Sequence, residues 1–429
     1  MANNDNDMKR LFWGFVAIIL LAACEADYGY HELAPSGDRG DSYSYKEGSD
    51  GDYFGEPGDE GEPVGNHDPQ HGAGIVTAGE WCDLDNWGFW GNLMTYEGED
   101  TTDQDGNEIH IDGYSEVSGY WKFWTDRRVA VKVVDASQKP QPGVRVTLYS
   151  GQNEVWNAVT DVAGRADCWI GLHDKDFQAS ALSVSLDGKK MDAAPEMTSW
   201  SDESAKVNEY VFAPEKAPAN SADILFIVDA TGSMMDEIDF LKDDLLDILN
   251  RGSKLQGSFT IRTGALFYRD KGDDYLTRES AFTKDFNKTV NFIKKQQADG
   301  GGDYPEAVHT ALEVSLQKFD WDDSARARLA FILLDAPPHH DHQGVLESLQ
   351  KSIDKYAEMG IKLIPVASSG VDKPTEFLLR MMAIATESTY VFLTDDSGVG
   401  NSHIKPTVGE YEVEQLNDLM VRLIQKYLQ

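Results

Sequence analysis

The C-terminal half of the chain alternates short apolar runs with longer segments of helical spacing, and this alternation constrains the fold most. Residues 224–228 (ILFIV) form a continuous apolar run, which is typical of a strand buried on both faces. The apolar residues that follow recur at helical spacing: Met235, Ile238, Leu241, Leu245, Ile248 and Leu249. Repeated strand–helix units predict an α/β fold with a doubly wound, mostly parallel sheet.

The same alternation continues toward the end of the chain. It predicts strands at 261–268, 329–335, 361–367 and 389–394, each followed by a helical pattern, and a closing amphipathic helix. We therefore expect an α/β domain over residues 221–429. Ligands of such sheets bind beyond the carboxyl ends of the strands, so polar residues at those ends are the candidates for a site.

Residues 125–215 have a different periodicity. Val129, Val131 and Val133 alternate with other residues, and 144–148 repeats the pattern after the turn KPQPG. Short strands with period-two alternation, separated by turns, predict a small β-sandwich. This region resembles carboxypeptidase-regulatory-like (prealbumin-like) modules, and the resemblance implies a spacer or binding unit rather than an enzyme.

The aromatic-rich segment at 73–124 connects this region to the N-terminal part of the chain. Trp81, Trp87 and Trp90 make it too apolar for a linker, so we expect an ordered patch that docks on a neighbouring domain; an aromatic ligand site is the alternative. Pairing of Cys82 with Cys168 stays open, because spacing alone does not place them within bonding distance.

The N-terminus has the pattern of an export signal. Lys9 and Arg10 precede a 13-residue apolar run that ends at Cys24, as in a secretory signal over residues 1–23. Residues 21–24 (LAAC) resemble the bacterial lipoprotein lipobox, which implies cleavage before Cys24 and lipidation of its thiol. An ordinary signal peptide with an incidental cysteine is the alternative.

Residues 24–72 are predicted to be a disordered, acidic tether. Between residues 25 and 68 the chain has 13 acidic and two basic residues and few aliphatic ones, so it has little apolar surface to bury. The segment resembles those behind the lipidated cysteine of Bacteroidetes surface lipoproteins. This resemblance implies a lipid-anchored protein of the bacterial outer membrane, at the cell surface, with the periplasmic face as the alternative.

The overall charge excludes one class of partner. The chain has 38 Lys and Arg against 74 Asp and Glu, a formal net charge of −36. Binding to the phosphate backbone requires basic surface, so no nucleic-acid partner is expected.

Three polar clusters fall at the expected strand ends. Residues 229–234 (DATGSM) follow the first buried strand, 300–306 (GGGDYPE) precede a helix, and 335–338 (DAPP) follow strand 329–335. Carboxylates and hydroxyls on adjoining loops can surround one hard cation, Mg²⁺ or alternatively Mn²⁺ or Ca²⁺. Helix capping is the alternative for the first cluster.

These three motifs together resemble the metal-ion-dependent adhesion site of von Willebrand factor type A domains. The resemblance implies that Asp229, Thr231, Ser233 and Asp335 bind the metal. The middle loop presents Asp303 where adhesive members have a threonine, so we assign Asp303 as a further ligand, directly or through water. Capping of the following helix is its alternative role.

Three further residues are candidates for contact with a partner: Glu306, His339 and His340. Glu306 is expected in the first turn of a helix, where the helix dipole favours an acid. The histidines follow Asp335 on the same side of the sheet, and solvation in a polar loop is their alternative.

We expect no enzymatic activity. Ser233 lacks the G-x-S-x-G turn of a nucleophile, and the chain has no phosphate-binding glycine motif; a metal-dependent hydrolase is a remote alternative. The expected function is metal-dependent binding of a protein or glycoprotein ligand. An envelope scaffold, with a metal that is purely structural, is the main alternative.

Overall fold

The computed structural model describes residues 74–102, 108–254, 259–400 and 403–428, which all belong to one unit of the chain, residues 57–429. The predicted signal sequence, Cys24 and the acidic tether lie outside the described residues. Among the described helices, none combines the length and apolar character needed to cross a bilayer.

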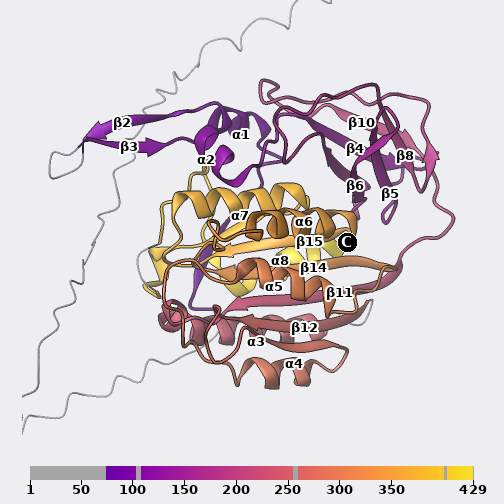
Figure 1. The fold of residues 1–429 in the computed structure, drawn as a ribbon. Helices are drawn as coiled ribbons and strands as arrows, with labels where there is room; N and C mark the ends of the chain where they lie inside the picture. Colours follow the sequence, from indigo (N-terminus) through magenta and orange to yellow (C-terminus); the bar gives the residue numbers. More distant parts are fainter. Residues whose placement is uncertain (1–73, 103–107, 255–258, 401–402, 429) are drawn as a thin grey trace, which may run out of the picture. The chain divides into compact units, whose positions relative to one another are not determined.

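An eight-stranded sheet forms the centre of the C-terminal half (Figure 1). Five strands run parallel: β11 (Ala219–Asp229), β12 (Thr260–Tyr268), β14 (Ala325–Leu334), β15 (Ile361–Ala367) and β16 (Tyr390–Leu393). Three antiparallel strands complete it: β13 (Thr277–Thr283) beside β12, and then β1 (Thr77–Trp81) and β17 (Glu414–Gln415) beyond β16. The predicted mostly parallel α/β sheet is confirmed.

Helices cover both faces of this sheet. On one side pack α3 (Ile238–Lys254), α4 (Phe286–Ile293) and α8 (Leu416–Leu428), and on the other α5 (Val308–Gln317), α6 (Val345–Glu358) and α7 (Lys373–Ala385). Strand β11 shows why its sequence is apolar throughout. Leu225 and Ile227 belong to the core under α5–α7, whereas Phe226 and Val228 belong to the core under α3 and α8.

Strand β1 was not predicted. Ala78 pairs with Leu393 of β16 and with Glu414 of β17, so a segment more than 300 residues away in sequence completes the sheet. The domain boundary expected at residue 221 therefore leaves out one strand. The residues between β1 and β11 are therefore inserted between two strands of the same sheet, and we call them the insertion.

Two smaller sheets form most of that insertion. One contains β4 (Arg128–Val134), β7 (Arg165–Trp169) and β10 (Val207–Val211); the other contains β5 (Arg145–Ser150), β6 (Asn153–Val159), β8 (Leu182–Leu186) and β9 (Lys189–Lys190). Val131 of the first sheet and Val146 of the second belong to the same buried cluster. The likeness to carboxypeptidase-regulatory-like modules stays a prediction.

The aromatic segment packs on the α/β domain. Trp90 of α1 (Trp87–Met94) stacks on Phe377 of α7, with ring centroids 5.9 Å apart. The indole of Trp121, at the end of α2 (Tyr114–Trp121), donates to the carbonyl of Pro374 at 2.8 Å.

A separate ladder joins β2 (Gly98–Thr102) and β3 (Glu108–Asp112). Cys82 and Cys168 are both free thiols.

Candidate metal site

The loop after β11 forms a compact turn around its own carboxylate. Asp229 is fully buried, and its Oδ1 accepts from the backbone N–H of Thr231 at 2.9 Å and from the Thr231 hydroxyl at 2.7 Å. The hydroxyls of Thr231 and Ser233 lie 3.2 Å apart. The structure thus brings together all three residues predicted from the DATGS motif.

Asp335 lies at the end of the neighbouring strand. Strands β11 and β14 are paired, with Val228 opposite Leu333, so Asp229 and Asp335 leave the same edge of the sheet. Within the described residues, Asp229 Oδ2 and Asp335 Oδ1 are buried without a hydrogen-bond partner. Buried polar atoms are rarely left unpaired, because an unpaired one costs free energy.

The glycine-rich loop is held against the DATGS turn. The backbone N–H of Gly232 donates to the carbonyl of Gly300 at 3.0 Å, and that of Asp299 donates to Ala230 at 3.1 Å. Gly301 has φ +74°, and a Cβ there would lie 2.9 Å from Glu306 Oε1 and 3.3 Å from Thr231 Cβ. A side chain at this position would therefore be strained and would displace Glu306.

Glu306 is the buried carboxylate of this loop. It is 2% exposed, and its Oε2 has no hydrogen-bond partner among the described residues. Burial, followed by the charges of Asp229, Asp270 and Asp335, raises its pKa to about 9. Helix α5 begins only at Val308, so Glu306 lies in the loop, where its N–H donates to Pro337 at 2.8 Å.

Asp303, the ligand assigned from the sequence, lies beside Asp270 and His339. Its side chain is exposed, and one of its carboxylate oxygens, one of Asp270 and a ring nitrogen of His339 lie within 4.8 Å of one another. Among the described residues, neither Asp303 nor Glu306 is grouped in this way with Asp229 and Asp335. Glu306 is therefore a further candidate ligand, and coordination of the first metal by Asp303 stays a prediction.

The surroundings of the three buried acids disfavour their charged forms. Burial raises the pKa of Asp229. Burial and then the charge of Asp229 raise the pKa of Asp335, while the Ser233 hydroxyl acts in the opposite direction. A cation among the three carboxylates would remove this cost, because it would balance their charge.

The donor set fits a hard divalent ion. Three carboxylates and two hydroxyls supply oxygen ligands alone, which suits Mg²⁺, Mn²⁺ or Ca²⁺. The unpaired, buried oxygens of Asp229, Asp335 and Glu306 are the structural observation that supports this fit.

Comparison with known proteins identifies the domain that carries this site. The model of the von Willebrand factor A domain family matches residues 223–400. Residues 223–400 are a von Willebrand factor A (VWA) domain. Domains of this family commonly bind other proteins.

The curated relatives share only part of the chain. The chain is 31% identical over 121 residues to an ariadne-like RING finger protein of Acanthamoeba polyphaga mimivirus, and 34% identical over 120 residues to the alpha-protein kinase vwkA of Dictyostelium discoideum. These matches cover 28% and 27% of this chain, but only 11% and 19% of the two relatives.

One similar solved structure is that of the conserved hypothetical protein BatB from Bacteroides thetaiotaomicron. It is 12% identical, with a TM-score of 0.33, and the match covers 48% of this chain and 98% of that chain.

The two histidines expected to contact a partner both have contacts within the chain. His339, 6% exposed in the VWA domain, shares a hydrogen bond with Asp270 Oδ1 at 2.9 Å. His340 hydrogen-bonds the carbonyl of Tyr120 at 2.8 Å and stacks on its ring at 3.7 Å. His340 thus ties the VWA domain to α2, and its contact with a partner stays a prediction.

A second layer behind the VWA site was not predicted. Glu237 is fully buried, and its Oε1 accepts from the N–H of Ser369 at 3.0 Å and lies 3.1 Å from His403 Nε2. Although burial opposes it, hydrogen bonding to Glu237 and Asp395 raises the pKa of His403. No local pattern joins these segments, so only the fold reveals the contact.

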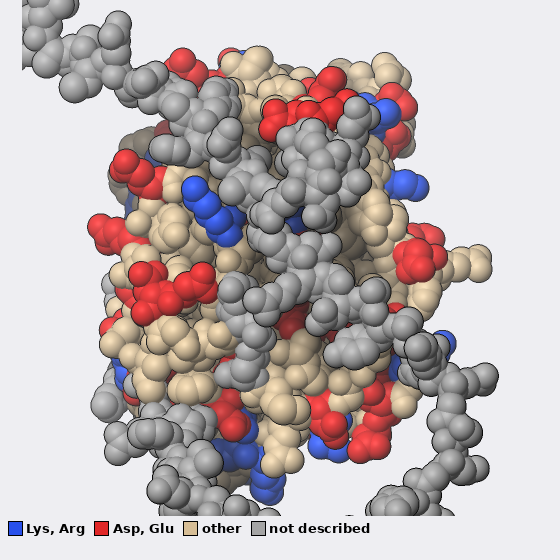
Figure 2. Space-filling view, turned by 90° about the vertical axis from the view of Figure 1, so that its left-hand side faces the viewer, with Lys and Arg blue, Asp and Glu red and all other residues tan. Residues whose placement is uncertain are grey.

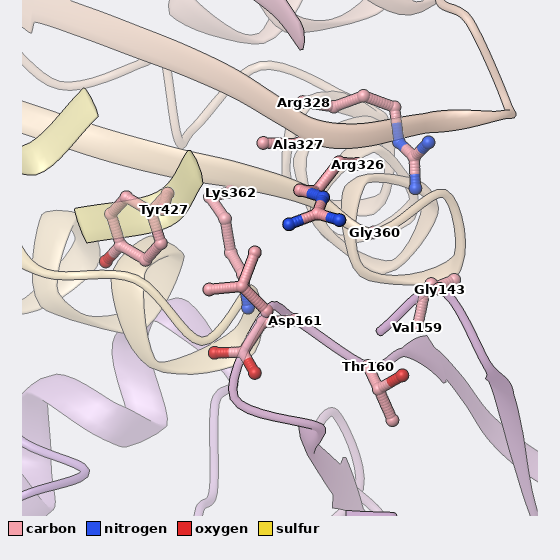
Figure 3. A pocket seen from close by; sticks show the side chains of 11 residues that line it. Gly143, Val159, Thr160, Asp161, Arg326, Ala327, Arg328, Gly360, Lys362 and Tyr427 are labelled. Atoms are coloured by element: carbon pink, nitrogen blue, oxygen red, sulfur yellow. The ribbon is translucent and has the colours of Figure 1, made fainter. Parts of the chain in front are cut away.

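A small pocket lies at the opposite ends of the strands (Figure 3). Its lining comes from the starts of β14 and β15 and from residues 159–162 of the insertion, and the figure shows Arg326 and Lys362 across from Asp161 and Thr160. Lys362 pairs with Glu387 at 2.9 Å, and Arg328 donates to the carbonyl of Met359 at 2.8 Å. These partners give the pocket a structural role at the contact between the VWA domain and the insertion.

Proposed function

We propose that the VWA domain binds a divalent cation, Mg²⁺ or alternatively Mn²⁺ or Ca²⁺, and uses the loops around it to bind a protein or glycoprotein partner. The ligands are Asp229, Thr231, Ser233, Asp335 and Glu306. The proposal depends on one observation: Asp229, Asp335 and Glu306 are buried, and each has an oxygen without a hydrogen-bond partner among the described residues. The charges of Asp229 and Asp335 raise the pKa of Glu306, and that of Asp229 raises the pKa of Asp335, so the three lie close enough to influence one another.

The charge of the site limits how it holds a partner. Three carboxylates around a divalent ion leave a net charge near −1, so the ion attracts a partner's carboxylate weakly. We therefore assign the cation the task of ordering the three loops, and the loops the task of contacting the partner. Figure 2 shows acidic and basic side chains in scattered patches, and the net charge of −36 disfavours a nucleic acid as partner.

The proposed setting is the bacterial outer membrane, with lipidation at Cys24 as the anchor. A surface adhesin and an envelope scaffold both fit this arrangement. Protease treatment of intact cells separates them, because an outward-facing domain is cleaved and an inward-facing one is protected.

The cation site is tested by thermal unfolding in EDTA and in Mg²⁺ at pH 8. In EDTA, Glu306→Gln should be more stable than the wild type. The acid, whose pKa is raised to about 9, must take up a proton to fold at pH 8, whereas the amide need not. In Mg²⁺ the wild type should gain stability, since the ion binds the folded state alone, and both Glu306→Gln and Asp229→Asn should gain less. Asp320→Asn is the control, because the Asp320 side chain is 98% exposed and lies outside the site.

Equal gains from Mg²⁺ in the wild type and in Asp229→Asn would refute the site. Partner binding is tested separately by affinity capture from bacterial and host extracts, with Mg²⁺ or EDTA. A partner held by the wild type in Mg²⁺ but not by Asp229→Asn supports the proposal. Equal capture by a folded Asp229→Asn variant supports the alternative, a structural metal.

A further inference from the structure

A second group of metal-ligating side chains lies beside the VWA site. Asp270 follows β12, Asp303 belongs to the glycine-rich loop, and His339 follows β14. One ligand atom from each lies within 4.8 Å of the others. Three separate loops thus converge on a point that the proposed site does not use.

His339 is the centre of this group. It also belongs to a second set of converging ligand atoms, with Asp341 and His342. The rings of His339 and His342 are stacked, with centroids 4.5 Å apart and an angle of 5° between the planes. Nitrogen and oxygen ligands are therefore gathered around one imidazole.

A third imidazole has an unpaired ring nitrogen. His309 lies on α5, and its Nδ1 is buried without a hydrogen-bond partner among the described residues. Burial lowers the pKa of His309, and the charges of Glu313, His339, Asp270 and His342 follow as smaller effects. An unpaired, buried ring nitrogen close to this group is an additional available ligand.

A purely structural ion pair explains only part of this arrangement. Asp270 and His339 are 7% and 6% exposed and hydrogen-bonded to each other, as a structural pair would be. Such a pair does not account for the approach of Asp303, or for the unpaired nitrogen of His309.

We propose that Asp270, Asp303 and His339 form a second cation site, which takes a borderline metal such as Zn²⁺, with His309 or a water as fourth ligand. Imidazole together with carboxylate suits Zn²⁺, whereas the oxygen ligands of the first site suit Mg²⁺. Ligands at the usual 2.0–2.2 Å from a tetrahedral zinc lie roughly 3.3–3.6 Å apart. The 2.9 Å contact between Asp270 and His339 needs only a small opening to reach this spacing.

The test titrates metal-free protein with Zn²⁺ by calorimetry and with Co²⁺ by visible absorption. The wild type should bind Zn²⁺ and give the d–d bands of a Co²⁺ ion with nitrogen and oxygen ligands. Asp303→Asn and His339→Gln should each lower the affinity by about tenfold or more. Asp303 is exposed, so its substitution tests ligation without disturbing the core.

His110→Gln is the matched control. His110 lies in a separate exposed group with Asp112 and Glu116, which could bind metal on its own. Loss of binding in His110→Gln, or unchanged binding in both Asp303→Asn and His339→Gln, would overturn the proposal.

The two sites can fail independently. His339→Gln should keep the stabilisation by Mg²⁺, and Asp229→Asn should keep the binding of Zn²⁺. A protein that binds Zn²⁺ at His339 but gains nothing from Mg²⁺ would retain the second site and reject the first.

Discussion

At the scale of single residues, Arg380 is the most deeply buried charge that links the insertion to the VWA domain. It is fully buried on α7, and its Nε donates to Asp83 Oδ2 at 2.9 Å. It also donates to the hydroxyl of Tyr114 at 3.1 Å and to the carbonyl of Thr407 at 2.5 Å. One side chain thus joins four segments of the chain.

Arg380→Met should lower the free energy of unfolding by about 3–5 kcal/mol, because it leaves the buried Asp83 without its partner. Urea denaturation measures the change. The control is Lys351→Met, whose pair with Glu347 is 73% and 71% exposed, and which should cost at most about 0.5 kcal/mol. Equal effects of the two substitutions would show that the buried pair contributes nothing special.

Asp244 predicts a pH dependence of stability. It is 1% exposed on α3, and its Oδ1 accepts from the N–H of Gly74 at 2.6 Å. Burial raises its pKa to about 7 from a usual 3.8. The folded state therefore favours the protonated acid. The contribution of Asp244 to the free energy of unfolding is fully present below the unfolded pKa of 3.8 and is lost as the pH rises through about 7.

Asp244→Asn should be about 1–3 kcal/mol more stable than the wild type at pH 8 and nearly equal to it at pH 4, since the amide still accepts from Gly74 without ionising. Denaturation at the two pH values measures this. Asp320→Asn should show no such trend, because its side chain is exposed. A difference that does not grow between pH 4 and pH 8 would contradict the assigned cause.

The sequence predicted the site residues whose placement is local or follows from strand pairing. Asp229, Thr231 and Ser233 are two residues apart in one turn, and Asp335 ends the neighbouring strand. Glu306 could not be separated from Asp303 in this way. The choice depends on where α5 begins and on which side chain turns inward, and both are decided by packing.

At the scale of elements, the same distinction explains which strands were predicted. Strands β11, β14 and β15 are buried on both faces, so their sequences are continuous apolar runs. Strand β1 has the sequence TAGEW, which is short and has no such run. Its place is set by β16 and β17, which are too distant in sequence to be paired with it by local rules.

Gly79→Val tests whether β1 is needed in the sheet. A Cβ at Gly79 would lie 2.7 Å from the ring of Phe392 and 2.8 Å from that of Tyr411. We expect a loss of about 1–3 kcal/mol, because the larger side chain cannot fit between these rings. Gly119→Ala in α2 is the control; a Cβ there meets nothing within 4 Å, and it should stabilise slightly.

Urea denaturation followed at the VWA domain measures the effect of Gly79→Val. A stability equal to that of the wild type would mean that β1 adds nothing to the sheet. Such a result would return the domain boundary to residue 221, as the sequence suggested.

At the scale of the whole described unit, the insertion and the VWA domain share one core. A single buried cluster contains Trp90 and Val131 of the insertion together with Leu349 and Phe377 of the VWA domain. Polar contacts cross the same interface, including His173 to Asp354 at 2.8 Å. A shared core of this kind favours cooperative unfolding, because neither side can open without exposing the other.

Two optical probes separate the two sides. Eight of the ten tryptophans lie between residues 81 and 200, so fluorescence reports mainly on the insertion. Helices α3–α8 all belong to the C-terminal half, so far-UV circular dichroism at helical wavelengths reports mainly on the VWA domain. We expect the two probes to give one coincident urea transition.

Trp121→Ala extends this prediction. The side chain is 1% exposed and donates to Pro374 of α7, so its removal should cost about 3–5 kcal/mol and shift both probes equally. A fluorescence transition that moves while the dichroism transition stays would show that the insertion unfolds alone. The insertion would then only dock on the VWA domain, without sharing a core with it. The VWA loops would then bind cations independently of the insertion.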